Sequence, residues 1–406
     1  MSTSLMYHGF GIKSNFVYKK TEYKGGAIYF TIERPLDACC CAHCGSYKVK
    51  SSGKKVRKFI NLPIGNKPTC IFANLHRLEC KECGRILQEE IPFAVKRKRY
   101  TKSFARYVMD LSKEMTISSI ASHLKVGWDL IKDIQKSNLE KKYKRLKAKN
   151  IRYLAIDEIS SHKGHKYLTV VMDLESGAVI YVAKGRKKES LDGLWRKLGR
   201  YKKNIKAVAM DMWPAYLDAV TSHLPQAKVV FDHFHIVKIF NNKLSELRRQ
   251  LYRELKDVMQ KEVLKGTRWL LLKNSENLDE AKDEKQRLEE ALRLNKPLAT
   301  AYYLKEELRL LWSLESVDSA KKFLGQWCRK AIASGIKILQ EISKMLLSHK
   351  SRIFNYFTFK ISTGLLEGIN NKIKVLKRKI YGFRDFELFK LKIFDLHNCK
   401  FDLKGA

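Results

Sequence analysis

Residues 151–186 read IRYLAIDEISSHKGHKYLTVVMDLESGAVIYVAKGR, and this stretch decides the fold class. Three short β-type runs follow one another, separated by Lys-Gly-His and Glu-Ser-Gly turn signals. The first run contains three consecutive apolar residues, 154–156, as in a strand covered on both faces. Its end delivers Asp157, a carboxylate placed where a metal ion could bind. The stretch therefore predicts the start of an α/β core whose chemistry depends on further carboxylates reaching Asp157.

The composition of the chain points to a polyanionic partner. With 406 residues the chain is long enough for several domains, and its formal net charge is +39. Such a charge attracts nucleic acid above all. A membrane partner is not expected, because no apolar run approaches the roughly 18 residues that a spanning helix needs. The first ten residues also lack the layout of a signal peptide, so we expect a cytoplasmic protein that binds nucleic acid.

Residues 1–92 contain two Cys-x-x-Cys pairs with 35 residues between them, each followed by a glycine that allows a tight turn. Four soft ligands suit a structural zinc ion, because a complete cysteine set leaves no open position for catalysis. We expect a zinc ribbon whose ligands are Cys41, Cys44, Cys80 and Cys83. Cys39 or Cys40 could replace Cys41 in register, and His43 and His76 are further possible ligands. Buried structural cysteines are the alternative to a metal site.

Residues 93–150 are predicted to be a basic, helical DNA-binding region. A cluster that we expect to contact phosphate comes first, formed by Lys96, Arg97, Lys98 and Arg99. Next comes a helix with Ile117, Ile120, Ala121 and Leu124 on one face, and it breaks at Val126-Gly127. The following segment from Trp128 to Lys136 suits the recognition helix of a helix-turn-helix, with Trp128 and Lys132 as DNA contacts. An αα-hairpin that serves only packing is the alternative.

Residues 151–235 continue the α/β pattern after the three opening strands. A helix is predicted over 187–200, and a fourth strand follows it and ends in Asp211. Another helix starts at Pro214, and a fifth strand ends in Asp232. Carboxylates are the hard ligands that Mg²⁺ prefers, and phosphoryl transfer in nucleic acid uses two such ions. Glu158 is a poor candidate because neighbouring strand residues point to opposite faces, and a turn or cap is the alternative for each aspartate alone.

Residues 236–350 and 351–406 complete the predicted architecture. The first segment is helical throughout, which predicts an all-helical domain inserted into the core, with Trp269, Trp312 and Trp327 packed inside it. In the second segment a break at 362–364 precedes a helix that carries Glu367 in its first turn. Beyond Glu367 this helix presents amide and basic groups that we expect to bind DNA: Asn370, Asn371, Lys374, Lys377 and Arg378.

Several stretches together resemble the ISL3-family insertion-sequence transposases. They are the zinc-ribbon start, IDEISSHKGHKYLTVVMD, VAMDMWPAYLDAV, FDHFHIVK and EGINNKIKVLKRKIYGFRDF, in the same order and over nearly the whole chain. The resemblance implies a multidomain α/β protein with an RNase H-like core, in which the first and fourth strands are adjacent. It implies a DDE catalytic triad of Asp157, Asp211 and Glu367 that binds Mg²⁺ or Mn²⁺. Asp232 and His235 resemble an element that supports the site or the scissile strand.

The resemblance also implies the reaction and the partners. The expected enzyme binds the terminal inverted repeats of its element as double-stranded DNA, cleaves the strand and transfers it to target DNA. A homodimer or larger assembly on DNA, in the nucleoid of a prokaryotic cytoplasm, would bring two ends together. Two other classes are the alternatives, a non-catalytic DNA-binding regulator derived from a transposase and an RNase H-like nuclease. The complete set of acids disfavours the regulator, and the end-reading domains disfavour the nuclease.

Overall fold

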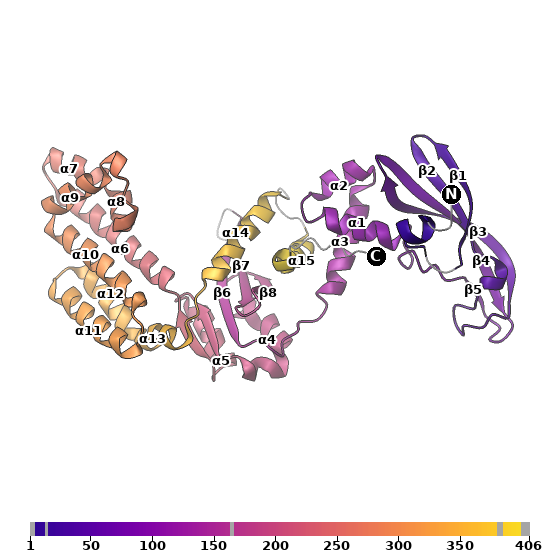
Figure 1. Cartoon of the computed structure of the whole chain (residues 1–406). Helices are drawn as coiled ribbons and strands as arrows, with labels where there is room; N and C mark the ends of the chain where they lie inside the picture. Colours follow the sequence, from indigo (N-terminus) through magenta and orange to yellow (C-terminus); the bar gives the residue numbers. More distant parts are fainter. Residues whose placement is uncertain (1–4, 13–14, 163–165, 380–384, 399–406) are drawn as a thin grey trace. The chain divides into compact units, whose positions relative to one another are not determined.

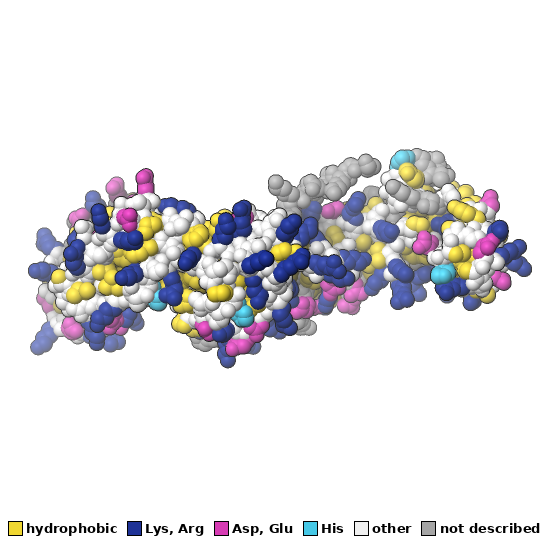
Figure 2. Space-filling model, turned by 90° about the horizontal axis from the view of Figure 1, so that it is seen from below, with side chains coloured by type: hydrophobic (Ala, Val, Ile, Leu, Met, Phe, Trp, Pro, Cys, Tyr) yellow, Lys and Arg dark blue, Asp and Glu magenta, His cyan; other side chains and the backbone are white. Residues whose placement is uncertain are grey.

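The computed structural model describes residues 5–12, 15–162, 166–379 and 385–398, which form two compact units (Figure 1). One unit consists of Met1–Arg145 and Val375–Ala406, and the other consists of Leu146–Lys374. The predicted C-terminal segment, 351–406, is thus divided between the two units. Lys and Arg side chains are spread over the visible surface of both units, as the net charge of +39 requires (Figure 2).

The first unit contains a five-stranded sheet in the order β1-β2-β4-β3, with β5 paired to β4. Its strands are β1 (Val17–Lys24), β2 (Ala27–Glu33), β3 (Val49–Ile64), β4 (Lys67–Cys80) and β5 (Ile86–Gln88). The strands β2 and β4 are parallel, whereas β3 and β4 form a long antiparallel hairpin. Alternate residues of β2 are buried, with Phe30 and Ile32 fully inside, as expected for a sheet with one face in a core.

The helices of the first unit confirm the predicted helical pattern. They are α1 (Lys102–Leu111), α2 (Ile117–Leu124), α3 (Trp128–Lys142) and α15 (Phe386–Asp395). The Thr116 side chain caps α2 by accepting a hydrogen bond from the Ser119 amide. Three of the four predicted apolar positions of α2 are buried, and Ile117 packs at the edge of the same core. The predicted break at Val126-Gly127 is present, and Lys125 (φ 53°) ends α2 in the left-handed conformation while Gly127 precedes α3.

The helix α15 packs against α3, although nearly 250 residues separate them in the sequence. Asp385 caps α15 by accepting from the Leu388 amide at 3.1 Å, and it pairs with Lys132 (3.3 Å) and Lys136 (3.1 Å) of α3. The Leu388 amide and the two lysines hold the pKa of Asp385 at about 2. At the other end, Asp395 accepts from Lys142 of α3 at 2.6 Å. The helix α15 therefore packs with the region 93–150 that the sequence predicts to bind DNA.

The second unit contains another five-stranded sheet, in the order β10-β9-β6-β7-β8. Its strands are β6 (Tyr153–His162), β7 (Lys166–Asp173), β8 (Ala178–Lys184), β9 (Ala207–Met210) and β10 (Lys228–Phe231), which confirms all five predicted strands. The strands β6, β7 and β8 are antiparallel, whereas β9 pairs parallel with both β6 and β10. Leu154–Ile156 are fully buried, and α4 (Asp192–Leu198) and α5 (Pro214–His223) pack in the same core.

The predicted helical segment of the second unit is helical. It consists of α6 (His233–Glu254), α7 (Val258–Lys265), α8 (Arg268–Leu272), α9 (Glu284–Leu294), α10 (Lys296–Arg309), α11 (Val317–Ala333), α12 (Lys337–Ser348) and α13 (Lys350–Phe359). Trp327 is fully buried and donates its indole N–H to the Leu304 carbonyl at 2.8 Å, and Trp312 packs at the edge of this core. The expectation that Trp269 lies inside is wrong, because its side chain is 65% exposed and stacks only with the neighbouring Arg268.

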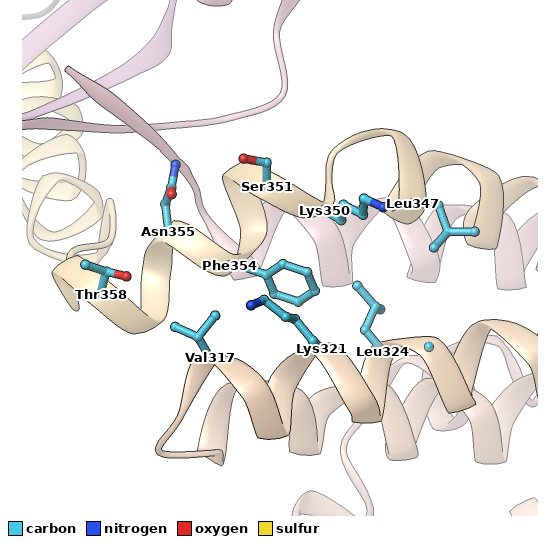
Figure 3. A pocket seen from close by; sticks show the side chains of 10 residues that line it. Val317, Lys321, Leu324, Leu347, Lys350, Ser351, Phe354, Asn355 and Thr358 are labelled. Atoms are coloured by element: carbon cyan, nitrogen blue, oxygen red, sulfur yellow. The ribbon is translucent and has the colours of Figure 1, made fainter. Parts of the chain in front are cut away.

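The helix α13 connects the helical block to the sheet. Asn355 donates its side-chain amide to the Val229 carbonyl of β10 at 2.7 Å. A hollow of about 570 Å³ lies between α11 and the α12–α13 pair, and Phe354 and Lys321 project toward its centre while Asn355 points away from it (Figure 3). The lining contains no carboxylate, so this hollow is not a site for metal-dependent chemistry.

We predict that Asp385→Ala loosens α15, because it removes the cap and both ion pairs. A lost cap costs about 1 kcal/mol, and the ion pairs add little because they are partly exposed. Hydrogen exchange of the amides in 386–395 should accelerate about fivefold, as 1 kcal/mol implies. Glu387→Ala is the control, since Glu387 pairs only with Lys390 one turn away. Equal exchange in the two variants would show that Asp385 does not hold the helix.

Candidate functional site

The parallel pairing of β6 and β9 brings two carboxylates together. Ile156 lies opposite Met210 in the register, so the next residues, Asp157 and Asp211, lie at the same level of the sheet. Asp211 directly follows β9, whereas Asp157 lies inside β6 and pairs with Val170, so the expectation that Asp157 ends its strand is wrong. Asp157 accepts from the Glu158 amide at 2.7 Å, and Asp211 accepts from the Trp213 amide at 3.1 Å. The sequence resemblance implied this adjacency, and the strand register provides it.

The two carboxylates lie in an environment that disfavours their charges. Burial raises the pKa of Asp157 and the pKa of Asp211, and the charges of Asp211 and Asp232 raise that of Asp157 further. The charge interaction with His235 lowers the pKa of both groups, and Lys238 and Arg186 lower that of Asp211. A set of buried carboxylates that repel one another is stabilised by a cation, and their oxygens are the ligands that Mg²⁺ and Mn²⁺ accept.

Asp232 connects the starts of two helices. It directly follows β10 and caps α6, accepting from the Phe234 amide at 3.1 Å. Its second carboxylate oxygen accepts from the hydroxyl of Thr363, and both side chains are almost fully buried. Thr363 directly precedes α14 (Gly364–Lys379) and accepts the first backbone hydrogen bond of that helix, from the Glu367 amide. Asp232 therefore fixes the start of α14 against the carboxylate group.

Glu367 lies between the two contacts that attach α14 to the site. Thr363 is four residues before it, and Asn370, three residues after it, donates its amide to Asp157 at 2.7 Å. Residues three and four apart lie on one side of a helix, so Glu367 is on the side of α14 that meets the carboxylates. Its own side chain is exposed. Figure 1 shows α14 in yellow beside β6 and β7.

The amide and basic residues of α14 are placed in different surroundings. Asn370, which the sequence prediction assigns to DNA, is 5% exposed and hydrogen-bonded to Asp157. Asn371 and Lys374 are exposed and hydrogen-bond each other at 3.1 Å, which leaves them accessible to a partner. Arg378 is exposed and Lys377 is half-buried.

Two further charged residues act on the aspartates: Arg186, which the sequence interpretation did not name, and Glu158, which it rejected as a candidate. The Arg186 guanidinium lies 4.4 Å from the ring centroids of both Tyr167 and Trp213, and it pairs with Glu158 at 3.4 Å. The Trp213 indole donates to the Arg186 carbonyl at 3.0 Å, which secures the loop after Asp211. Burial and the charge of Asp211 raise the pKa of Glu158. The adjacent Asp-Glu pair was a usable signal, whereas no local pattern marks Arg186.

The four predicted cysteines converge at one point of the first unit. The sulfur atoms of Cys41 and Cys83 are 3.7 Å apart, those of Cys44 and Cys80 are 3.6 Å apart, and all four lie within 4.8 Å of one another. Zn–S bonds of about 2.3 Å in a tetrahedron place the sulfurs about 3.8 Å apart, so the cluster fits a zinc ion. Both pairs are followed by a glycine in the left-handed region, Gly45 (φ 74°) and Gly84 (φ 67°), as the sequence predicts.

The structure also distinguishes between the alternative zinc ligands. Cys41 completes the cluster, whereas Cys39 is buried and donates to the Pro35 carbonyl. His43 is exposed and lies outside the cluster. His76 is buried, and its ring nitrogens are engaged by the Ser51 hydroxyl and the Arg34 carbonyl.

A second buried group, formed by Cys39, His76 and Glu89, resembles a metal site in its residue types. The Glu89 carboxylate already accepts from the His76 amide at 2.7 Å and pairs with the Arg34 guanidinium at 3.4 Å. Arg34 offsets the charge that a metal ion would otherwise neutralise. This group is therefore a polar network that joins the ends of β2, β4 and β5.

Some of the residues that the sequence predicts to contact DNA in the first unit already pair with other residues of the protein. Lys96, Arg97 and Arg99 are exposed, whereas Lys98 pairs with Asp133 of α3 at 3.6 Å. Trp128 is 47% exposed at the start of α3, where a recognition helix meets base edges. Lys132 lies over the Trp128 ring at 5.4 Å and pairs with Asp385, so α15 already engages its charge.

Three family models match the chain in the order of these elements. They describe a zinc finger of the IS204/IS1001/IS1096/IS1165 transposases (37–83), a helix-turn-helix domain of transposase family ISL3 (89–137) and a transposase domain (154–393). The chain belongs to the ISL3 family of transposases. The transposase domain covers both β6 and α14, so the sheet carboxylates and Glu367 lie in one family domain.

Related transposases match along almost their whole length. The transposase for insertion sequence element IS1001 of Bordetella parapertussis is 31% identical over 390 residues, covering 95% of each chain. The transposase for IS1557 of Mycobacterium tuberculosis is 27% identical over 398 residues, covering 90% of this chain and 88% of that protein. A chain of the Drosophila P element transposase strand transfer complex aligns over 75% of this chain and 93% of its own, with 12% identity and a TM-score of 0.37. At a TM-score this low, the similarity supports no conclusion about this chain.

Within the described ranges, the structure has no helix whose length and apolar character would allow it to cross a membrane.

We predict that Cys80→Ser lowers the zinc content of the purified protein from one ion per chain to near zero. The three remaining thiolates bind zinc far more weakly than the complete set of four, and the folding of this region depends on the metal. Cys40→Ser is the matched control, because Cys40 adjoins Cys41 but lies outside the cluster. Metal analysis of both variants checks the assignment. Zinc loss in Cys40→Ser alone would contradict the assigned set of zinc ligands.

We predict that Asp157→Asn raises the melting temperature of the metal-free protein. A carboxylate with a raised pKa destabilises the folded state at neutral pH, and wild-type stability recovers as pH falls toward that pKa. The difference should be about 2–4 °C at pH 8, as for 1 kcal/mol in a unit of this size, and should shrink at pH 5. Mn²⁺ should stabilise the wild type and leave Asp157→Asn unchanged.

The control for this experiment is Asp218→Asn. Asp218 is exposed, and the Lys188 ammonium lowers its pKa. Mn²⁺ should therefore stabilise Asp218→Asn as it does the wild type. Equal Mn²⁺ stabilisation of Asp157→Asn would show that Asp157 does not bind the metal ion.

Proposed function

We propose that this transposase cleaves and joins DNA at an RNase H-like site formed by Asp157, Asp211 and Glu367. The observation that supports the proposal most strongly is the parallel register of β6 and β9, which sets Asp157 beside Asp211. The strand order β10-β9-β6-β7-β8, with three antiparallel strands followed by two parallel ones, is the arrangement expected for that core. The attachment of α14 on both sides of Glu367 supports the third member.

The carboxylates are suited to hold Mg²⁺ or Mn²⁺. Their burial and mutual repulsion favour a bound divalent cation. Such ions, when bound, stabilise the attacking and leaving oxygens of a phosphodiester. The surrounding residues orient the ligands, because Asn370 fixes one oxygen of Asp157 and the Trp213 amide fixes one oxygen of Asp211. In the first unit the four cysteines are suited to a structural zinc ion.

The proposed reaction consists of two in-line displacements. Water attacks the phosphodiester at the 3′ end of the element, and the bond between phosphorus and the element's terminal O3′ breaks. The products are a free 3′-hydroxyl on the element and a 5′-phosphate on the flanking strand. This hydroxyl then attacks a phosphodiester of the target, forming a new P–O bond while the target's own 3′-oxygen leaves with a proton. Lys238 and Arg186, whose charges act on Asp211, are placed to attract the phosphate that reacts.

The same proposal assigns roles to the first unit. The zinc ribbon and the helix-turn-helix would bind the terminal inverted repeats, with Trp128 at the start of α3 near the base edges. Lys96, Arg97 and Arg99 would contact phosphates, and Asn371, Lys374, Lys377 and Arg378 would do so on α14. Joining two ends calls for two copies of the chain, so we expect a dimer or larger assembly on the nucleoid DNA of a prokaryote.

We predict that Glu367→Gln reduces strand cleavage by at least about 10³-fold while leaving DNA binding unchanged. The substitution preserves size and removes the charge that would complete the site. The measurement is Mg²⁺- or Mn²⁺-dependent cleavage of a duplex that carries the element's end, with binding followed by gel shift in Ca²⁺.

Glu158→Gln is the comparison variant, because Glu158 is the other glutamate near the aspartates. It should reduce cleavage only in part, since Glu158 pairs with Arg186. Loss of cleavage in Glu158→Gln together with normal cleavage in Glu367→Gln would identify Glu158 as the third carboxylate. Wild-type protein that binds ends without cleaving them would be a regulator, and one that cleaves branched DNA without end preference would be a nuclease.

A further inference from the structure

A groove in the first unit lies between the sheet and the turn of the helix-turn-helix. It has a volume of about 600 Å³, and residues of β2, β3 and β4 form one side of it. His123 and Lys125, at the end of α2 and in the turn before α3, lie on the other side. Arg99, from the basic cluster at 96–99, also lines it. The groove therefore joins three parts of the chain that the sequence suggested as separate DNA-binding features.

The charge of this groove has one sign. Four of its lining residues carry basic side chains, namely Lys58, Arg99, His123 and Lys125, and no aspartate or glutamate lines it. Lys58 lies 5.2 Å from the centroid of the Tyr29 ring, and no ion pair with an acid within the described residues is recorded for any of the four. Cations gathered in a concave site without counter-charges attract an anionic ligand.

Asn61 provides an independent sign of a missing partner. This residue lines the groove, is 2% exposed, and uses its side-chain oxygen to accept from the Thr101 hydroxyl at 2.9 Å. Its side-chain nitrogen is buried and has no hydrogen-bond acceptor in the described part of the chain. An unsatisfied buried donor costs about 1–3 kcal/mol, and an acceptor oxygen that enters the groove would remove this penalty.

The surface of α3 explains why such cations are needed. Its exposed side chains include three acids, Asp129, Asp133 and Glu140. Its lysines at 132 and 136 are engaged by Asp385 of α15. A helix with this surface can meet base edges at its start, but it supplies little positive charge for the phosphates on either side. The groove lies beside the turn from which α3 begins, so it is positioned to supply that charge.

We propose that this groove binds backbone phosphates of the DNA duplex whose major groove receives the start of α3. The inference rests on the proposed function and deepens it, because the zinc-ribbon sheet and the helix-turn-helix then form one continuous DNA-binding surface. Lys58, Arg99 and Lys125 contact phosphate oxygens, and Asn61 donates to one of them. These contacts do not read bases, so they raise the affinity for every duplex and set the register of α3.

The test measures how DNA binding depends on salt. The variant Lys58→Gln/Arg99→Gln loses two groove charges, and the control Lys50→Gln/Lys55→Gln loses two exposed charges of the same β3 strand that do not line the groove. Dissociation constants are measured between 50 and 300 mM KCl for a duplex carrying the element's end and for a scrambled duplex. Zinc content and circular dichroism show that each variant is folded.

Two lost phosphate contacts should make the slope of log K against log salt shallower by about 1.8 for Lys58→Gln/Arg99→Gln, equally on both duplexes. The control should keep the wild-type slope within about 0.5. Equal slopes in the two double variants would overturn the groove assignment. Wild-type protein that does not distinguish the end from the scrambled duplex would overturn only the proposed end recognition, because the slope on either duplex still tests the groove.

Discussion

Two half-buried carboxylates that lie side by side are the constraint on which the second unit depends. The parallel pairing of β6 and β9 places Asp157 beside Asp211, where burial and mutual repulsion raise the pKa of Asp157. A fold optimised only for stability would not retain such a pair, because each charge is more stable in water. The neighbouring residues reduce the penalty with hydrogen bonds from the Glu158 and Trp213 amides and from Asn370. The remaining negative charge is what makes the position suitable for divalent cations.

The same carboxylates close a very long loop of the chain. After β10 the chain forms the helical block and returns to the sheet at α13 and α14, where Thr363 bonds to Asp232 across 131 residues and Asn370 bonds to Asp157 across 213. Closing a loop of this length costs entropy, but the cost grows only slowly with length, so a large insertion is tolerated here. Asn355 adds a third attachment, to β10. Glu367 is consequently held near the aspartates by its neighbours on the helix, although its own side chain is exposed.

Charge is distributed in the first unit so that the zinc-ribbon sheet and the helix-turn-helix complement each other. The start of α3 presents Trp128, while Lys132 and Lys136 bond to Asp385 and hold α15 in place. Lys58, Arg99 and Lys125 lie in the groove beside the turn, together with the unsatisfied Asn61 amide. In the proposed DNA complex, such a division would leave the start of α3 to approach bases while the groove binds backbone phosphates. The net charge of +39 therefore indicates a binding surface mainly where basic side chains form no ion pair with an acid of the described residues.

The sequence by itself determined the features that depend on local patterns. Short apolar runs bounded by turn signals predicted the five strands of the second unit, and the Cys-x-x-Cys pairs with their glycines predicted the zinc site, because neighbouring residues set these patterns. Only the tertiary structure shows that Cys41, and not Cys39, belongs to the zinc cluster and that Asn370 donates to Asp157. The same holds for the exposure of Trp269 and for the packing of α15 against α3. Arg186 joined the site in the same way, through contacts with Tyr167 and Trp213 from other strands and loops. Each of these outcomes depends on which distant residues meet in space, and periodicity along a chain carries no record of that.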